Sequence, residues 1–424
     1  MTDTAIRANR IQTLDVIRGI AVMGIFSVNV IDFALVQQAY LNPAAAGGAH
    51  GIDLGLWFAN HVLIDEKMRT LFSILFGAST LLVIERALAK GESAKRVHYG
   101  RMVSLFVLGL LHFYLIWIGD ILVSYAATGM VAYLFVKRRT RTLLIWAAVL
   151  LVTASAMFSA GSWQFHSMEQ KVATHRATPK EIKTWQGMSS FATVDPVKAA
   201  ATTETYRSKW PTRTERRFAK EKWQPFGGVI PFLPETLGLM LIGMAGFRSG
   251  FLTGQWPRRT YKRIAAAGLG VGVLFSSVTA ASLIALNFSA WLLLGANYGF
   301  GLLPHLAMAL GYASLIMLAM RPGGWLTDRI AATGRAAFSN YLGTSIVASL
   351  IFYGDGLGLF GHLSRAQAWA VAVPGMWLLM LAWSKPWLDR FNYGPFEWLW
   401  RSMARGKVQP MRKARPAAMV EVVA

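Results

Sequence analysis

The sequence predicts an all-α protein that crosses a membrane about ten times and keeps both termini in the cytoplasm. Hydrophobic residues make up 54% of the 424 positions, and charged residues only 15%. Apolar runs of about 20 residues, the length that crosses roughly 30 Å of hydrocarbon, recur along the chain. The net charge of +22 comes from basic residues between these runs, where they set orientation, so we expect no nucleic acid partner.

Ten segments are apolar and long enough to span the bilayer, and we expect them to form a single transmembrane domain over residues 1–424. Asp15 and Arg18 interrupt the first one, which favours a retained membrane helix over a cleaved signal peptide. Residues 54–65 are expected to form a half-embedded helix before the second span. The expected spans are 11–31, 66–86, 101–118, 120–136, 142–160, 229–247, 264–286, 301–320, 335–353 and 367–384.

The distribution of basic residues predicts the orientation. With the N-terminus inside, every inner segment is basic, from Arg7 and Arg10 onward, whereas the short outer loops hold only Arg365. This asymmetry fits ten spans with both ends in the cytoplasm of a multi-pass protein of the bacterial inner membrane. The short outer loops are 32–65, Gly119, 287–300 and 354–366.

Two segments fall outside the spans. Residues 161–226 form a long extracytoplasmic loop, either a cap over the membrane mouth or a mobile linker with few aliphatic residues. Residues 385–424 are expected to form a cytoplasmic interfacial helix, rich in aromatic residues from Phe391 to Trp400, and a basic tail that reaches Arg415. The tryptophans that favour a cap are Trp163, Trp185, Trp210 and Trp223.

The first span contains three polar side chains, Asp15, Arg18 and Asn29, although a central charge costs about 2.5–3.5 kcal/mol. Asp15 and Arg18 are three residues apart and can pair, and Asn29 returns to the face of Arg18 about 16 Å further along. One interpretation is an anchor, in which Arg18 reaches the headgroups and Asn29 binds a neighbouring helix. The other is a functional stripe that is polar at two depths.

A second group of polar residues lies in the outer half of the expected spans. His112 lies about 9 Å into the membrane, and Glu235 follows two prolines at a similar depth. His112 is either satisfied by an interhelical hydrogen bond or a base that deprotonates a hydroxyl or amine. Glu235 or Asp120 would orient such a base, and Asp120 also suits the cap of the next helix. The same outer half holds Asn29, His61, Asp65 and His305.

A third group lies toward the cytoplasm. Arg18, Arg335 and Asn340 fall within a few turns of the inner face, where positive charges suit a phosphate-rich ligand such as coenzyme A. Lys67 and Arg69, at the outer start of the second span, either hold an anionic acceptor or meet headgroups. The chain has no cysteine, which excludes a thiolate nucleophile and a thiol metal site, and we expect no metal.

Seven motifs from Leu14 to Arg401 resemble those of the YeiB-like family, known as domain of unknown function 418. Through its first helix this family is similar to the wider transmembrane acyltransferase group, which includes the heparan glucosaminide acetyltransferases and membrane O-acyltransferases that modify surface polysaccharides. The resemblance implies that an acyl group passes from cytoplasmic acyl-CoA to an acceptor across the membrane. The motifs are LDVIRGIAVMGIFSVNV, AYLNPA, KMRTLFSILFGAS, LLHFYLIWIGDILVSYA, LGYASL, GRAAFSNYLGTS and YGPFEWLWR.

The resemblance also assigns residues. Arg18 matches the first-helix arginine, and Asn29 matches the amide of the glucosaminide enzymes, where the bacterial O-acyltransferases carry histidine. Tyr40 stands at the spacing of the glucosaminide enzymes' catalytic histidine. The histidine of the YeiB-like motifs, His112, is followed by Gly119 and Asp120, and is therefore the candidate base.

We therefore expect an acyltransferase whose donor substrate is acyl-CoA, and we expect the acyl group to be acetyl. Asn29 would donate to the thioester carbonyl. The expected partners are the lipid bilayer, acyl-CoA, an extracytoplasmic glycan, lipid or small-molecule acceptor, and optionally a second copy in a homodimer. Two other classes remain open: a transporter or channel for a small metabolite or lipid, whose path the same charges would line, and a structural or regulatory membrane component.

Overall fold

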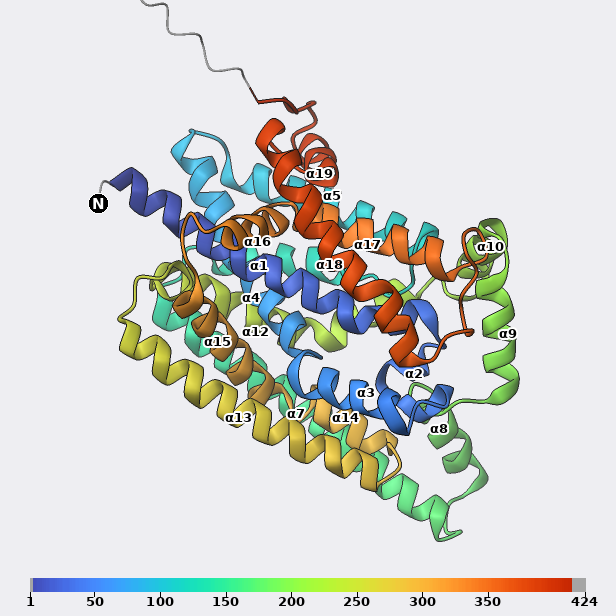
Figure 1. Ribbon diagram of the computed structural model, residues 1–424. Helices are drawn as coiled ribbons and strands as arrows, with labels where there is room; N and C mark the ends of the chain where they lie inside the picture. The colour runs from blue at the N-terminus through green and yellow to red at the C-terminus, as the bar shows by residue number, and fades with distance from the viewer. Residues whose placement is uncertain (1–2, 414–424) are drawn as a thin grey trace, which may run out of the picture.

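The chain folds into a bundle of helices around a continuous apolar core, and no strand occurs within residues 3–413, the part that the computed structural model describes. Side chains are described from Gln12 onward, so those of Arg7 and Arg10 lie outside the described residues, as do positions 414–424 of the expected basic tail. The long helices run roughly from one end of the molecule to the other (Figure 1).

All ten expected spans correspond to helices, with ends that differ by a few residues. The largest difference is at α7, which continues 13 residues past its expected end at 160. The helices are α1 (Asp3–Ala34), α4 (Lys67–Ala89), α5 (Ala94–Leu115), α6 (Leu122–Ala132, extended by the 3-10 turn η2, Tyr133–Phe135), α7 (Thr140–Ala173), α12 (Val229–Arg248), α13 (Arg258–Ala285), α15 (Leu302–Ala319), α17 (Ala337–Phe352) and α18 (Arg365–Arg390).

Seven segments of the described chain are long and apolar enough to cross a membrane, and two further apolar helices, Leu122–Phe135 and Ala337–Phe352, are shorter. The protein is therefore a helical membrane protein by length and composition. The seven segments are Gln12–Ala34, Gly51–Ala89, Thr140–Ala173, Val229–Arg248, Arg258–Ala285, Leu302–Ala319 and Arg365–Arg390.

Several short helices connect the long ones. The segment expected to be half-embedded forms α3 (Gly51–Leu63), and two expected loops contain the helices α14 (Ala290–Tyr298) and α16 (Trp325–Arg335). The remaining short elements are α2 (Gln38–Leu41), η1 (Pro43–Ala46) and η3 (Phe251–Thr253).

Loops that the charge pattern assigns to one side of the membrane meet at one end of the bundle. At the end that holds the start of α1, side-chain contacts join loops far apart in sequence. They link Gln12 to Asp328, Arg405 to Glu92, and Arg248 to the carbonyls of Val136 and Arg138. At the opposite end Ser364 and Ala366 donate to Asp53, and Arg365 donates to the carbonyl of Ala39.

The long loop 161–226 is helical rather than extended. Beyond the end of α7 it forms α8 (Pro179–Ser189), α9 (Pro196–Arg207), α10 (Trp210–Lys220) and α11 (Gln224–Gly227). Helices α8, α9 and α10 lie together along the edge of the molecule away from the N-terminus (Figure 1). A capping box at Thr178 and Glu181 begins α8, and Asp195 caps α9.

Helix α10 fastens this cap to the bundle. Trp210 Nε1 donates to the carbonyl of Leu115 at 2.6 Å, and Arg217 Nη2 donates to that of Ile116 at 3.1 Å. The buried Arg213 pairs with Asp355, in the loop after α17. The cap therefore covers the C-terminal end of α5.

Two pairs of helices cross at glycines, where only a missing side chain allows the approach. A Cβ added to Gly334 of α16 would lie 1.8 Å from the carbonyl oxygen of Asp15 in α1, and one added to Gly19 would lie 2.2 Å from that of Ile330. Helices α4 and α12 cross at Gly77 and Gly243 in the same way. Small residues at such crossings are how membrane helices gain van der Waals contact without a hydrophobic driving force.

We predict that Gly334→Ala separates α16 from α1 and destabilises the protein by about 1–3 kcal/mol, the usual cost of overpacking. The measurement is the thermal unfolding midpoint of the purified protein in detergent. The matched control is Gly343→Ala, since nothing lies within 4 Å of a Cβ at that helical position. An equal midpoint for both variants would contradict the proposed crossing constraint.

We predict that acidification loosens the cap. Burial favours the neutral acid of Asp355, but hydrogen bonds from Arg213 and the Trp210 amide outweigh it and hold its pKa below the usual 3.8. A carboxyl with a lowered folded-state pKa stabilises the fold above its unfolded pKa, and this contribution is lost as pH falls through the folded-state value. Asp355→Asn should remove it at all pH values, seen as faster tryptic cleavage of α10 at neutral pH, whereas Asp195→Asn should leave α10 protected.

Candidate functional site

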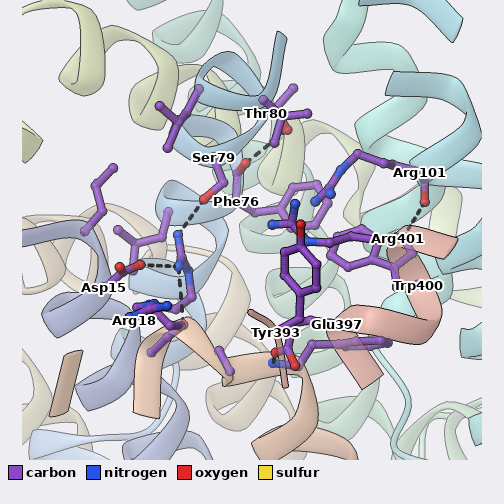
Figure 2. A pocket seen from close by; sticks show the side chains of 18 of the residues that line it. Asp15, Arg18, Phe76, Ser79, Thr80, Arg101, Tyr393, Glu397, Trp400 and Arg401 are labelled. Carbon is purple, nitrogen blue, oxygen red and sulfur yellow. Dashed lines mark hydrogen bonds and ion pairs between the residues drawn. The ribbon is translucent and has the colours of Figure 1, made fainter. Parts of the chain in front are cut away.

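A cavity of about 940 Å³ opens at the end of the bundle that holds the start of α1. Helices α1, α4, α5, α6, α16, α17 and α18 supply its walls, together with α19 (Pro395–Arg405). Its volume is at the upper end of the range for small-molecule sites. Figure 2 shows side chains from both ends of the sequence, Arg18 and Arg401 among them, meeting in this space.

Basic side chains dominate the mouth of the cavity. Eight Lys and Arg residues line it against four Asp and Glu residues. The basic ones are Arg18, Arg86, Lys90, Arg101, Arg335, Lys385, Arg401 and Arg405, and the acidic ones are Asp15, Asp328, Asp389 and Glu397.

Several of these cations have no acidic partner. Among the described residues, no carboxylate lies within salt-bridge distance of Arg86, Arg101, Arg335 or Arg401. Arg101 instead stacks on the ring of Trp400, with its Cζ 4.0 Å from the ring centroid, and Arg401 stacks on Tyr393 at 4.6 Å. Because like charges repel, a cluster of unpaired guanidinium groups around one space favours an anionic ligand.

Arg18 links three helices at the side of the cavity. Its Nη1 donates to Asp15 Oδ1 at 2.8 Å and to the Gly334 carbonyl at 3.3 Å, and its Nη2 donates to Ser79 Oγ at 2.7 Å. The expected pairing of Asp15 with Arg18 is therefore confirmed. Arg18 is held among α1, α4 and α16 and faces the cavity, an arrangement that differs from a side chain extended to the headgroups.

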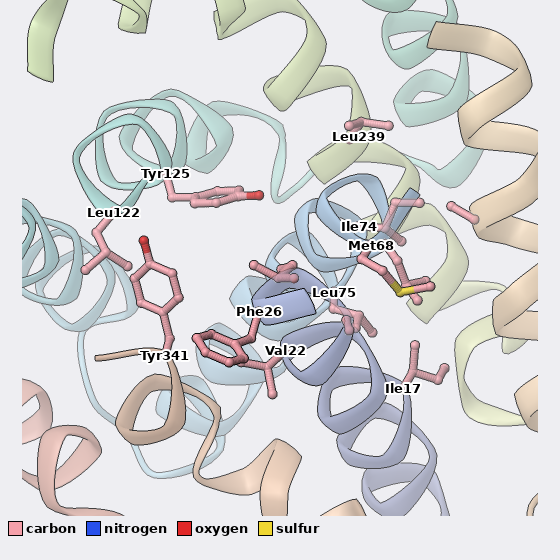
Figure 3. Packing of buried hydrophobic residues seen from close by; sticks show 14 of the residues in the cluster. Ile17, Val22, Phe26, Met68, Ile74, Leu75, Leu122, Tyr125, Leu239 and Tyr341 are labelled. Atoms are coloured by element: carbon pink, nitrogen blue, oxygen red, sulfur yellow. The ribbon is translucent and has the colours of Figure 1, made fainter. Parts of the chain in front are cut away.

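The inner end of the cavity, which is the deep end opposite its mouth, is apolar and aromatic. It is lined by Val22 and Ile25 of α1, Phe72 and Phe76 of α4, and by a closing group from other helices. This closing group consists of Leu122, Tyr125 and Tyr341. Figure 3 shows Tyr125 and Tyr341 near Leu122, with Phe26 and Val22 close to Tyr341.

A histidine and an aspartate lie directly behind this closing group. Nδ1 of His112 is 2.8 Å from Oδ1 of Asp120, and both side chains are 1% exposed. The ring of His112 is 5.4 Å from that of Tyr341, centroid to centroid. Asp120 Oδ2 also accepts from the Val123 amide at 3.0 Å, so this residue both orients His112 and satisfies the start of α6.

The other ring nitrogen of His112 is free. Its Nε2 is buried and has no hydrogen-bond partner within the described part of the chain. On its far side the ring meets Trp117, whose Nε1 donates to Asp32 of α1 at 2.9 Å. A histidine fixed through Nδ1 by a carboxylate, with Nε2 unpartnered, has the arrangement of a general base.

Asn29 lies on the face of α1 that borders the cavity. The helical spacing that brings Arg18, Val22 and Ile25 to the cavity places Asn29 one turn further on. Its side chain is half-buried. It therefore falls between the inner end of the cavity and Asp32, which contacts the residues around His112.

Glu235, Lys67 and Arg69 meet elsewhere, in a buried charged cluster near the N-terminal end of α4. Arg69 Nη2 lies 2.5 Å from Glu235 Oε1 and 2.5 Å from Glu66 Oε2. Lys67 is 1% exposed and donates to the carbonyl of His61. Of the two expected partners of His112, Asp120 contacts it, whereas Glu235 pairs with Arg69. Lys67 is buried among protein groups.

Asn340 lies outside the lining of the cavity. Its amide nitrogen donates to the Thr333 carbonyl at 3.0 Å and to Ser384 Oγ at 3.2 Å, and its oxygen accepts from Trp383 Nε1 at 2.9 Å. These bonds tie α16, α17 and α18 together.

Sequence reasoning missed Arg101 and Arg401 as cavity residues, because basic side chains at inner helix ends also fit an orientation signal.

Glu397 was also missed by the sequence analysis. Its carboxylate accepts from the Phe338 and Ser339 amides at 2.7 and 3.1 Å and from the Ser339 hydroxyl. It thereby caps α17 from α19 and fixes the floor of the mouth. The motif FEWLW, in which an acid stands among aromatic residues, is the signal that could have drawn attention to it.

Comparison with known proteins places the chain in a family. The model of a family described as protein of unknown function (DUF418) matches residues 246–407. The uncharacterized protein YxaH of Bacillus subtilis (strain 168) is 30% identical over 416 residues, which cover 95% of this chain and 96% of YxaH. The uncharacterized protein YeiB of Escherichia coli (strain K12) is 29% identical over 426 residues, covering 96% and 97%. The chain belongs to the YeiB-like (DUF418) family.

Within this family the similarity extends over both sides of the cavity. The family model covers α16 to α19, and the two relatives also match the region of α1, α4 and α5. A third relative, the uncharacterized 39.9 kDa protein in the amylase 3'region of Bacillus acidopullulyticus, is 31% identical over 146 residues, or 34% of this chain and 40% of its own. No solved structure matches the chain.

The absence of cysteine makes the cavity directly testable by thiol labelling. We predict that Val83→Cys, at a lining position, reacts with a membrane-impermeant thiol reagent added to the side of the membrane where α19 lies. Val152→Cys, at an exposed apolar position on α7, should stay unreactive because no water reaches it in the bilayer. Labelling of Val83→Cys only from the other side would contradict the position of the mouth.

Proposed function

We propose that the protein is a transmembrane acyltransferase that passes an acyl group, with acetyl as the expected group, from cytoplasmic acyl-CoA to an extracytoplasmic hydroxyl or amine. The observation that carries this proposal is the cavity, which joins a cationic mouth to an apolar inner end beside the His112–Asp120 pair. The resemblance to the wider transmembrane acyltransferase group supports the same reaction class by analogy.

The mouth fits the donor substrate. Coenzyme A combines phosphate groups with a long, narrow thioester arm, so it needs cations at one end and a mainly apolar channel at the other. Arg335, Arg101 and Arg401 provide unpaired guanidinium groups for phosphate. The arm would extend between α1 and α4 toward Tyr125 and Tyr341.

The transfer step uses the free nitrogen of His112. His112 Nε2 takes the proton of the acceptor hydroxyl or amine as its oxygen or nitrogen attacks the thioester carbonyl carbon. The C–S bond then breaks, and the leaving thiolate receives that proton, so acyl-acceptor and free thiol are the products. Asp120 holds the imidazole through Nδ1 and stabilises its cationic form, and Asn29 donates to the developing oxyanion.

Tyr341 separates the cavity from the base in this conformation. Its ring lines the cavity on one side and meets His112 on the other. Transfer therefore requires a rotation of Tyr341 that joins the two spaces. Such a gate would keep water and acceptor from the thioester until the donor fills the cavity.

We further propose ten crossings with both termini in the cytoplasm of the bacterial inner membrane. The gathering of the basic loops with α19 at one end of the bundle supports this orientation, and the related proteins YxaH and YeiB are bacterial. Three further helices would then complete the ten crossings beside the seven longer segments. They are α5, whose first turns are charged, and the short helices α6 and α17.

The test is incubation of purified protein with labelled acetyl-CoA, following both binding and release of free thiol. We expect saturable binding that competes with unlabelled coenzyme A. His112→Gln should lower turnover by about 10²–10⁴-fold, the usual contribution of general acid-base catalysis, with little effect on affinity. Arg335→Ala should instead weaken binding by about 10- to 150-fold, because a charge-assisted hydrogen bond contributes about 1.5–3 kcal/mol.

Matched controls separate these roles from general damage. Arg259→Ala removes an exposed basic residue outside the cavity lining, and His175→Gln removes a histidine of the cap. Both should behave as wild type. Asp120→Asn keeps an oxygen for the Val123 amide, so it should fold but lose turnover. Absent binding of acetyl-CoA, or unchanged turnover in His112→Gln, would contradict the proposal and favour the alternative, a transporter.

A further inference from the structure

The charged cluster around Arg69 contains more carboxylates than cations. Among the described residues, the cations nearest Asp65, Glu66 and Glu235 are Lys67 and Arg69. Adding the next charged pair, Asp53 and Arg365, changes the count to four against three, so one negative charge remains in excess. An uncompensated charge in a buried, low-dielectric region is strongly disfavoured.

The neighbouring histidines do not supply the missing positive charge. His61 and His305 are buried beside Lys67, so a proton on either ring would place two positive charges side by side in a region without water. The other groups are phenols, which are neutral at ordinary pH. The titratable and charged groups around the cluster are Tyr40, Asp53, His61, Asp65, Glu66, Lys67, Arg69, Tyr125, Glu235, Tyr298, His305 and Arg365.

One atom in the cluster is free to carry the balancing charge. Glu235 is 1% exposed, and its Oε1 contacts Arg69, while its Oε2 is buried without any hydrogen-bond partner. Since almost no surface of Oε2 is accessible, a metal ion or an ammonium group does not fit against it. A proton needs no such space.

Arg69 connects the cluster with open space. Its side chain keeps 25% of its exposure, although Glu66 and Glu235, which contact it, keep only 4% and 1%. A water molecule bound to the guanidinium would be one hydrogen bond from both carboxylates. We propose that Glu66, Arg69 and Glu235 form a proton-binding site, in which the carboxylates around Arg69 share one exchangeable proton.

This inference does not depend on acyl transfer. It reverses the sign of the net charge expected near Lys67 and Arg69. Their positive charges are more than neutralised by the carboxylates of the protein itself. The cluster therefore suits a bound proton better than an anionic acceptor. It gives the outer half of the bundle a proton that can be exchanged with water, which is what a proton-coupled step requires.

The test is infrared spectroscopy of the purified protein, which detects the C=O stretch of a protonated carboxylic acid. Wild type should show this band at neutral pH and lose it on alkalinisation, and the band should shift when H₂O is replaced by D₂O. Glu235→Gln should abolish the band. Glu66→Gln should abolish it too, because removal of one carboxylate balances the charges of the cluster.

The matched control is Glu204→Gln, which alters an exposed glutamate of α9 and should leave the band unchanged. Two glutamine variants guard against failure of one to fold, which the unfolding midpoint reports. A wild type without the band, a band that persists in Glu235→Gln, or a band that does not shift in D₂O would each overturn the proposal.

Discussion

The bundle depends on one guanidinium group placed inside a membrane helix. Arg18 bonds to α1, α4 and α16 at once, through Asp15, Ser79 and the carbonyl of Gly334. This is possible because Gly19 and Gly334 let α1 and α16 approach to backbone contact, so that a carbonyl comes within reach of the charge. The same three helices form one wall of the cavity, and its shape therefore follows from how Arg18 is satisfied. An arginine that is costly to bury thus positions the site.

Helix α4 joins two polar regions that have opposite electrostatics. Arg86 and Lys90, at its inner end, line a cavity where cations lack partners, while Arg69, at its outer end, is surrounded by carboxylates. Phe72 and Phe76 lie between them. Ser73 bonds to Tyr125, which faces the cavity and also lies close to the charges of the outer cluster. Apolar residues alone would isolate the two regions, so Tyr125 is the side chain through which a change in one would reach the other.

The lengths of the apolar runs sufficed to predict the ten long helices, because a span of about 20 apolar residues has few alternatives in a membrane. The pairing of Asp15 with Arg18 also followed from local spacing. The partners of Glu235 did not, since nothing in a sequence says which of several buried carboxylates approaches Arg69. Asn340 is a similar case: its amide suits a ligand as well as an interhelical bond, and only the positions of Thr333, Ser384 and Trp383 distinguish the two. The helices of the cap were hidden because their stability comes from caps and from contacts with distant loops, such as Arg213 with Asp355.

The length of α7 has a consequence for what can approach the molecule. Its 34 residues extend about 51 Å at 1.5 Å per residue, roughly 20 Å more than the hydrocarbon core requires. This additional length of α7 places α8 and the rest of the cap beyond the bilayer. A large soluble molecule coming from the water therefore meets the cap first, whereas a molecule that diffuses within the leaflet can pass beneath it along the exposed apolar face of α7. For the proposed acyl transfer, this arrangement would favour an acceptor that is itself anchored in the membrane.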